Sequence, residues 1–337
     1  PRQLLAPRLP DGARGGDALP PPLGAPLTFG PEDPDAAVVF LHGHDEDAEN
    51  GWPERFKLLR RAHPRWRWVH LRAPRLPQTC LRGRPCRAWG NYISPSCTVI
   101  GNPDYNTPDA EGWYAASVAG VHECLEELRQ RHGLDPERVA VCGFSQGAAV
   151  ALEAAITFGA CGLGEGSRDA ARRGPAAAGA SRCQVAATDG VTEGSAGELR
   201  DRGPPPVGEA APSHLAGCIS LSGWLLPRAR AELARLAAGR LEGSAGGMLP
   251  IMILHGTADT LVDFRCGVDA EKRLREAGLP VSFTGYKGMD HGHLWPVRLY
   301  QAEVDGFLCG VLEGGARAVL SHGAPDAAQR GRPLWKK

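Results

Sequence analysis

Short stretches with the apolar pattern of β-strands recur along the chain, and each leads into a polar loop. They cover residues 36–41, 66–71, 139–142, 215–221, 249–254 and 281–286. Between several of them the apolar residues have helical spacing, over 115–131, 148–158, 267–277 and 295–312. Alternating strands and helices predict an α/β fold with a mostly parallel central sheet, helices on both faces and right-handed connections. The polar strand ends should meet along one edge of that sheet.

Four segments lack this pattern. Residues 1–30 are rich in Pro, Gly, Ala and Arg, which predicts a flexible leader with room for one edge strand at its end. Residues 160–214 carry almost no large apolar side chains and are expected to be a disordered insertion, and a similar tail covers 314–337. We therefore expect one compact domain over 31–313, interrupted by the insertion. The irregular stretch 78–110 is long enough to be a lid or pocket wall.

Charge and cysteine content narrow the function classes. Lys plus Arg and Asp plus Glu both number 38 among 337 residues, so no net charge favours nucleic acid or an anionic membrane as a partner. No apolar run approaches the roughly 20 residues of a membrane helix, and no signal peptide is visible. The ten cysteines are scattered without a C-x-x-C pair, which favours a reducing compartment, and we expect a cytoplasmic protein. Oligomeric state stays open.

The strand at 139–142 runs into Gly143-Phe-Ser145-Gln-Gly147, and a helix-forming stretch follows. This is a G-x-S-x-G pattern. Between a strand and a helix it predicts a nucleophile elbow, a strained turn that exposes the serine oxygen above the sheet. With 44 glycines in the chain the pattern alone is weak, and its context gives it weight.

A serine nucleophile needs a base and an acid that orients the base. Asp259 and His291 each follow a predicted strand, in the order Ser, Asp, His that α/β hydrolases use. Asp263 is the competing acid, although it stands where a helix should begin. The histidines of two strand-end His-Gly pairs, His42 and His255, are interpreted as structural. No nucleotide-binding loop and no metal-ligand spacing is found, so we expect no cofactor and no metal.

These motifs resemble the acyl-protein thioesterases and their relatives in the phospholipase/carboxylesterase branch of the α/β hydrolases. The matching pieces are Phe40-Leu-His-Gly43, Ala73-Pro-Arg-Leu-Pro77, Gly143-Phe-Ser-Gln-Gly-Ala148, Leu221-Ser-Gly-Trp-Leu225, His255-Gly-Thr-Ala-Asp-Thr-Leu-Val262 and Gly288-Met-Asp-His291. The resemblance implies Ser145 as nucleophile, His291 as general base and Asp259 as its partner. It also implies that the backbone N–H groups of His44 and Gln146 bind the oxyanion.

Two segments depart from the family pattern. The family's His-Gly-Leu-Gly-Asp loop is here His42-Gly-His-Asp-Glu-Asp47, and its Trp-Phe/Tyr-Asp wall is here Trp89-Gly-Asn-Tyr92. By resemblance, Leu76, Trp89 and Leu261 would contact the acyl chain of the substrate.

The resemblance predicts a serine hydrolase that forms an acyl-enzyme, with an acylated protein or a small or lipid ester as substrate. An acyl-protein thioesterase of the palmitoyl-protein hydrolase type is the first hypothesis, and a carboxylesterase or lysophospholipase acting on oxyesters is the second. A hydrolase-like binding protein without turnover is the third, because the oxyanion loop is altered.

Overall fold

The computed structural model describes residues 21–49, 51–92, 109, 112–158, 214–241, 249–294 and 299–314. The chain divides into two compact units. All the described residues belong to the unit made of residues 1–160 and 212–337.

The described strands build one large sheet and one hairpin. They are β1 (Gly24–Phe29), β2 (Ala36–Leu41), β3 (Trp66–Arg72), β4 (Arg75–Pro77), β5 (Pro85–Arg87), β6 (Val139–Phe144), β7 (Gly217–Leu221), β8 (Ile251–Gly256) and β9 (Val281–Tyr286). The large sheet has the order β1-β3-β2-β6-β7-β8-β9, and only β1 runs antiparallel to its neighbour. β4 and β5 pair separately. The predicted α/β fold with a mostly parallel sheet is confirmed.

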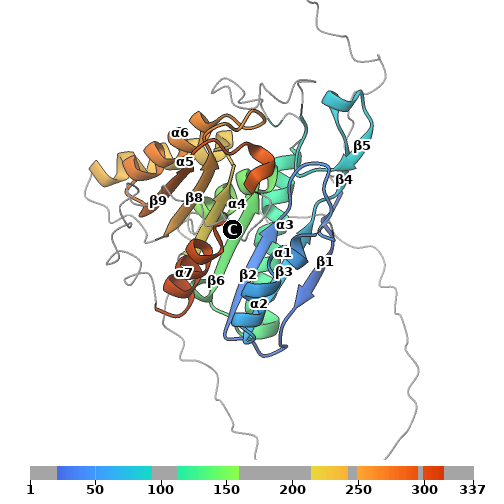
Figure 1. Ribbon diagram of the computed structural model, residues 1–337, viewed down its shortest axis with the longest axis vertical. Helices are drawn as coiled ribbons and strands as arrows, with labels where there is room; N and C mark the ends of the chain where they lie inside the picture. Colours follow the sequence, from blue (N-terminus) through green and yellow to red (C-terminus); the bar gives the residue numbers. More distant parts are fainter. Residues whose placement is uncertain are drawn as a thin grey trace, which may run out of the picture. The chain divides into compact units, whose positions relative to one another are not determined.

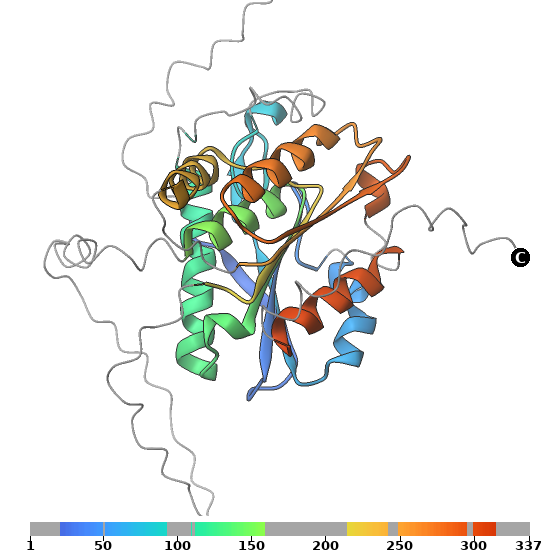
Figure 2. The same ribbon diagram turned by 90° about the vertical axis from the view of Figure 1, so that its left-hand side faces the viewer.

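Helices lie on both faces of the sheet (Figure 1). They are α1 (Trp52–Arg55), α2 (Lys57–Ala62), α3 (Trp113–His132), α4 (Gln146–Phe158), α5 (Pro227–Leu241), α6 (Phe264–Glu276) and α7 (Gln301–Leu312), with 3-10 turns η1 (Thr79–Leu81), η3 (Pro136–Arg138) and η5 (His291–Leu294). Figure 2 shows α3 to α6 on one side of the sheet and α1, α2 and α7 on the other. None of the helices in the described ranges is long and apolar enough to cross a membrane.

The strand β2 shows why this sheet is buried on both faces. All six of its residues are buried, and their side chains alternate between two hydrophobic clusters. Ala37, Val39 and Leu41 pack in the cluster under α3 to α6. The side chains between them, Val38 and Phe40 included, pack in the cluster with α1, α2 and α7. A continuous apolar run is therefore what a central parallel strand requires.

Several boundaries differ from those predicted. Within the helix expected over 295–312, α7 begins at Gln301, after Tyr300 with non-helical φ −124° and ψ 12°; residues 295–298 lie outside the described part. The stretch 78–110 is not wholly irregular, since it contains η1 and β5; its residues 93–108 lie outside the described part. The edge strand β1 falls within the expected leader. The expected insertion lies outside the described residues apart from residue 214, and the expected tail lies outside them apart from residue 314. The division into leader, domain, insertion and tail therefore stays a prediction.

One charged side chain is buried within the helical layer. Glu153 of α4 is 2% exposed, and its carboxylate accepts a hydrogen bond of 3.1 Å from the N–H of Ala229 in the first turn of α5. Burial raises the pKa of Glu153, and the hydrogen bond and Arg228 offset only part of this. Ionisation of Glu153 therefore destabilises the folded protein.

Replacing Glu153 by Gln should stabilise the protein more at high pH than at low pH. The folded-state pKa lies above the unfolded value of about 4.3, so wild-type stability falls as pH rises past that value, and Gln removes this loss. Melting temperatures of wild type and Glu153→Gln at pH 4.5 and pH 8 measure the effect. The matched control is Glu126→Gln. The pKa of Glu126 is lowered to about 2 by hydrogen bonds from Arg129 and Gln130, so this variant should show no gain at high pH. Equal pH dependence of the two variants would contradict the interpretation.

Candidate active site

Ser145 occupies a strained turn between β6 and α4. Its φ is 55°, in the left-handed region that residues with a side chain rarely adopt. Two neighbouring glycines allow this turn, because a side chain at either position would collide with backbone atoms. A Cβ on Gly143 would lie 2.4 Å from the carbonyl oxygen of Gly147, and a Cβ on Gly147 would lie 2.3 Å from that of His42. The N–H of Ser145 donates to the carbonyl of Leu221 at 2.8 Å, which ties the turn to β7.

Asp259 and His291 form a buried pair at the ends of two neighbouring strands, β8 and β9. Asp259 Oδ2 lies 2.7 Å from His291 Nδ1. The other oxygen, Oδ1, accepts the backbone N–H groups of Leu261 at 3.0 Å and Val262 at 2.8 Å. Burial alone would raise the pKa of Asp259, but hydrogen bonds from His255, His291 and Val262 outweigh it and hold the pKa well below its usual range. The carboxylate is therefore ionised at neutral pH.

The His291 ring lies beside the nucleophile turn. Its centroid is 4.8 Å from that of Phe144, the residue before Ser145. Since Asp259 can only accept, His291 Nδ1 carries the hydrogen and donates it. The other ring nitrogen, Nε2, then has a free lone pair, which is the tautomer that a general base needs.

The competing acid, Asp263, has a different role. It caps the N-terminus of α6, where its carboxylate accepts the N–H of Arg265 at 2.8 Å, and it also pairs with the Arg265 side chain. The geometry thus brings Asp259 to His291, and it leaves Asp263 at the surface.

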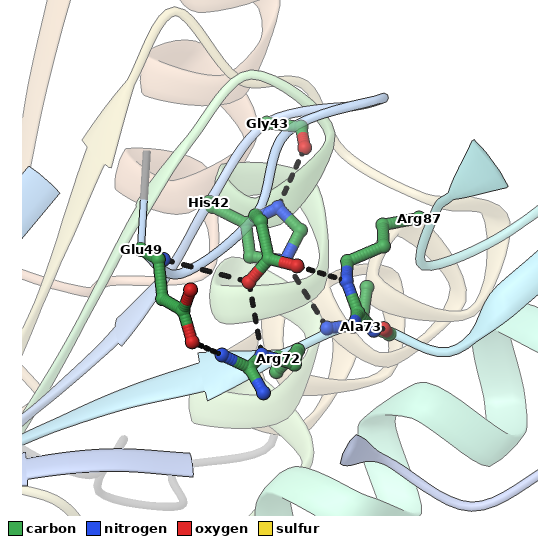
Figure 3. Close-up of polar contacts among 7 residues, drawn as sticks. His42, Gly43, Glu49, Arg72, Ala73 and Arg87 are labelled. Atoms are coloured by element: carbon green, nitrogen blue, oxygen red, sulfur yellow. Dashed lines mark hydrogen bonds and ion pairs between the residues drawn. The ribbon is translucent and has the colours of Figure 1, made fainter. Parts of the chain in front are cut away.

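His42 and His255, which lie at strand ends, form hydrogen bonds with backbone groups, in keeping with the structural role expected for them. His42 is fully buried; its Nδ1 donates to the carbonyl of Gly43 at 2.8 Å, and its Nε2 accepts the N–H of Ala73 at 3.1 Å (Figure 3). Burial lowers the pKa of His42 to about 4, so the ring stays neutral. His255 Nε2 donates to the carbonyl of Val262 at 2.8 Å and lies 3.4 Å from Asp259 Oδ2, so it also supports the Asp259 loop.

Comparison with known proteins agrees with this geometry. Residues 28–160 match the Phospholipase/Carboxylesterase family, and residues 96–294, more than half of the chain, match the alpha/beta hydrolase fold family. The chain belongs to the α/β hydrolases. It is a serine ester hydrolase of the thioesterase and carboxylesterase type.

Individual relatives are distant. Over 254 residues the hydrolase is 22% identical to Carboxylesterase SOBER1 of Arabidopsis thaliana, covering 75% of this chain and 82% of the relative. Over 260 residues it is 24% identical to Acyl-protein thioesterase 1 of Neurospora crassa, covering 76% and 80%. Among solved structures, acyl-protein thioesterase 2 of Zea mays aligns with a TM-score of 0.53 at 22% identity over 86% of this chain and 99% of that chain. The structural likeness supports the fold.

The two predicted oxyanion donors of this hydrolase lie on segments in direct contact. Gln146 begins α4, so its N–H has no carbonyl one turn earlier in the helix to bind. His44 follows Gly43 at the end of β2, and the close approach of Gly147 to the His42 carbonyl brings α4 against this loop. The side chain of Gln146 fixes the turn further, because its amide accepts the N–H of Trp89 at 2.9 Å and donates to the carbonyl of Gly90 at 3.1 Å.

Glu46 shapes the loop that differs from the family pattern. Its Oε2 accepts the N–H of Gly43 at 2.7 Å and the indole N–H of Trp52 at 2.8 Å. The His44 ring turns away from bulk solvent, 3.2 Å from the Gln78 amide oxygen and 4.4 Å between ring centroids from Tyr92. Burial lowers the pKa of His44. The altered loop therefore has a defined set of internal hydrogen bonds.

Charged side chains brace the same loop from outside (Figure 3). Asp47 accepts from Arg72 Nε at 2.9 Å and also pairs with Arg87. Arg72 pairs in addition with Glu49, and Arg87 donates to the carbonyl of Ala73 at 2.9 Å. The network joins the loop after β2 to the end of β3 and to β5, and so fixes the loop's position over the sheet edge.

The three residues predicted to contact the substrate differ in their exposure. Leu76 and Trp89 are 1% and 0% exposed, so neither side chain presents surface to a substrate in this structure. Trp89 is packed inside because its indole N–H donates to the His42 carbonyl at 2.7 Å, which makes it a brace for the oxyanion segments. Leu261 is 41% exposed beside Asp259, and its contact with substrate stays a prediction.

Sequence reasoning missed the side-chain contacts that organise this site. Glu46 lies six residues from its partner Trp52, whereas Asp47 lies 40 residues from Arg87 and Gln146 lies 57 from Trp89. Such pairs leave no local pattern, because the fold brings them together.

Asp259→Asn should lower kcat about 10⁴-fold on a chromogenic ester, because Asn favours the wrong imidazole tautomer, as in other Ser-His-Asp sites. Asp263→Asn is the matched control. Asn also caps helices well, so this variant should keep near wild-type kcat and melting temperature. Equal losses in the two variants would contradict the assignment of Asp259.

Glu46→Ala should lower kcat about tenfold with little change in KM, because the Gly43 N–H loses its partner and the oxyanion loop loosens. Glu46→Gln should restore most of the rate, since an amide oxygen can accept the same two hydrogen bonds. The control is Glu49→Ala at the exposed end of the charged network. A change confined to KM, or no rescue by Gln, would argue against a positioning role for Glu46.

Proposed function

We propose that this hydrolase cleaves acyl thioesters in the manner of an acyl-protein thioesterase, with Ser145 as nucleophile, His291 as general base and Asp259 as the acid that orients it. The observation that carries the proposal is the 2.7 Å bond between Asp259 and His291, with the His291 ring against Phe144 beside the strained Ser145. A relative is named Acyl-protein thioesterase 1, which supports the thioester as the bond cleaved.

In the proposed acylation step, Ser145 Oγ attacks the substrate carbonyl carbon while His291 Nε2 takes the hydroxyl proton. Asp259, ionised because of its hydrogen bonds, stabilises the imidazolium that forms. The negative oxygen of the tetrahedral intermediate is bound by the N–H groups of His44 and Gln146, where the N-terminus of α4 adds its favourable dipole. The carbon–sulfur bond then breaks, and the proton from His291 leaves with the thiol.

Deacylation repeats the sequence with water. His291 takes a proton from the water as its oxygen attacks the acyl-enzyme carbonyl, and the same N–H groups bind the new oxyanion. The Ser145–acyl bond breaks, Ser145 recovers its proton from His291, and a free carboxylic acid leaves. The chemistry needs no group beyond these side chains and the backbone.

An oxyester substrate is the second candidate, because a carboxylesterase is also among the relatives and the same residues would cleave a carbon–oxygen bond. We further propose that the acylated protein or small ester is met in the cytoplasm. The buried core cysteines Cys142 and Cys218 form no disulfide, which agrees with a reducing compartment.

Covalent labelling with a fluorophosphonate tests the triad. The probe reacts with a serine only when its base and oxyanion site are in place. Wild type should be labelled, whereas Ser145→Ala should not, and His291→Ala should be labelled at least 100-fold more slowly. Ser222→Ala is the control serine, since Ser222 also has positive φ, at 49°, and lies outside the triad. Absent labelling of folded wild type would favour a binding protein without turnover.

Turnover of matched thioesters and oxyesters, from acetyl to palmitoyl, then identifies the substrate class. A kcat/KM for long-chain thioesters at least tenfold above that of the matched oxyesters supports the thioesterase. The opposite ratio supports the carboxylesterase, and the proposal for thioesters would then be abandoned.

A further inference from the structure

A second cluster of reactive side chains lies away from the catalytic residues. His63 follows α2, and Asp305, Cys309 and Glu313 follow one another at intervals of four along α7 and its C-cap, on one helix face. His63 is 242 residues from Asp305, so no spacing in the sequence predicts their meeting.

The ligand atoms of three of these residues converge on a small space. His63 Nε2 lies 2.6 Å from Asp305 Oδ1 and 3.7 Å from Cys309 Sγ, and the sulfur lies 3.9 Å from the same carboxylate oxygen. All lie within 4.8 Å of one another. In a tetrahedral zinc site, bonds of about 2.0 Å to N and O and 2.3 Å to S put such atoms about 3.3–3.6 Å apart. Shifts below about 1 Å would therefore complete the geometry.

The surroundings of His63 are those of a metal-ligating histidine. The other ring nitrogen, Nδ1, lies 3.6 Å from Glu313 Oε1, which is where a zinc-bound histidine commonly has a carboxylate partner. The ring stacks on Trp66 with centroids 3.8 Å apart and planes 9° apart, so its orientation is fixed. The His63 side chain is 12% exposed and that of Asp305 is 40% exposed, which leaves a path for an ion and a water.

Ion pairs of His63 with Asp305 and Glu313 account for only part of the cluster. One imidazole carries at most one positive charge, so the two carboxylates leave an excess of negative charge, and the Cys309 thiol lies beside the same ring. Burial, with Asp305 and Glu313 nearby, raises the pKa of Cys309 to about 11, so the thiol is protonated when no cation is present. A divalent cation would neutralise this excess and use all four groups.

We propose that His63 Nε2, Asp305 and Cys309 Sγ bind a zinc ion, with Glu313 hydrogen-bonded to His63 Nδ1 and a water in the fourth position. Binding breaks the Cys309 S–H bond, forms a zinc–thiolate bond and releases one proton to solvent. Cysteine and histidine with one carboxylate are donors that suit zinc.

The cluster lies at the end of the sheet opposite the catalytic residues. The neighbouring residue Leu312 accepts a hydrogen bond of 2.9 Å from Arg138, which stands at the amino end of β6. Ser145 follows the carboxyl end of the same six-residue strand, about 20 Å away at 3.3 Å per residue. Zinc there would join the end of α2 to the end of α7 and leave the catalytic residues unchanged.

Cobalt absorption of the full-length chain tests the site. Co²⁺ added to the protein should give an intense near-ultraviolet thiolate-to-cobalt absorption at one equivalent, and Zn²⁺ should abolish it by competition. Cys309→Ser should remove this band, and Asp305→Asn should weaken Co²⁺ binding at least tenfold. The matched control is Cys124→Ser, which replaces a free, partly buried cysteine on α3 and should keep the full band.

Isothermal titration with Zn²⁺ gives the second readout. Wild type should bind one Zn²⁺ at micromolar concentration or tighter and release a proton, and its melting temperature should rise in zinc but not in Mg²⁺. Fluorophosphonate labelling of Ser145 should be equal in wild type and Cys309→Ser. A folded wild type with no band, or an equal band in Cys309→Ser, would overturn the proposal whatever the outcome for esterase activity.

Discussion

The contact between the start of α4 and the end of β2 is the constraint on which the active site depends. At Gly147 the helix backbone comes so close to the His42 carbonyl that no side chain fits. A side chain at Gly143 would likewise collide with the Gly147 carbonyl. In this close packing Ser145 has positive φ, and the segments that carry the proposed oxyanion donors lie side by side. One contact thus positions both the proposed nucleophile and the proposed oxyanion site. The strain is stored in the turn and held by the sheet around it.

Buried polar groups help to maintain this arrangement. His42, Trp89 and Gln146 exchange hydrogen bonds among β2, the segment after β5 and α4. Each is almost completely buried, so a lost partner would leave a polar atom without water to replace it. The site therefore resists small rearrangements, and the buried His42 ring stays neutral.

The parts of this fold that could be predicted are those written locally in the sequence. The strands and their following loops gave the sheet, the elbow and the choice of Asp259, because strand ends of a parallel sheet meet at one edge. The sequence also indicated that a helix begins near Asp263, and in the structure this residue caps α6. The bracing by Glu46 and Asp47, the burial of Trp89 and the meeting of His63 with Cys309 depend on contacts between distant segments, and no periodicity records them.

The direction of α4 has a consequence for the course of the chain. The helix starts at the elbow and its 13 residues carry it about 20 Å away, so it ends at Phe158 toward the amino ends of the strands. β7 begins at those same amino ends, at Gly217. Residues 158 and 214, the described ends of this connection, thus lie on the side of the sheet opposite Ser145. Residues can be inserted or deleted in such a connection without altering the loops that carry Ser145, Asp259 and His291.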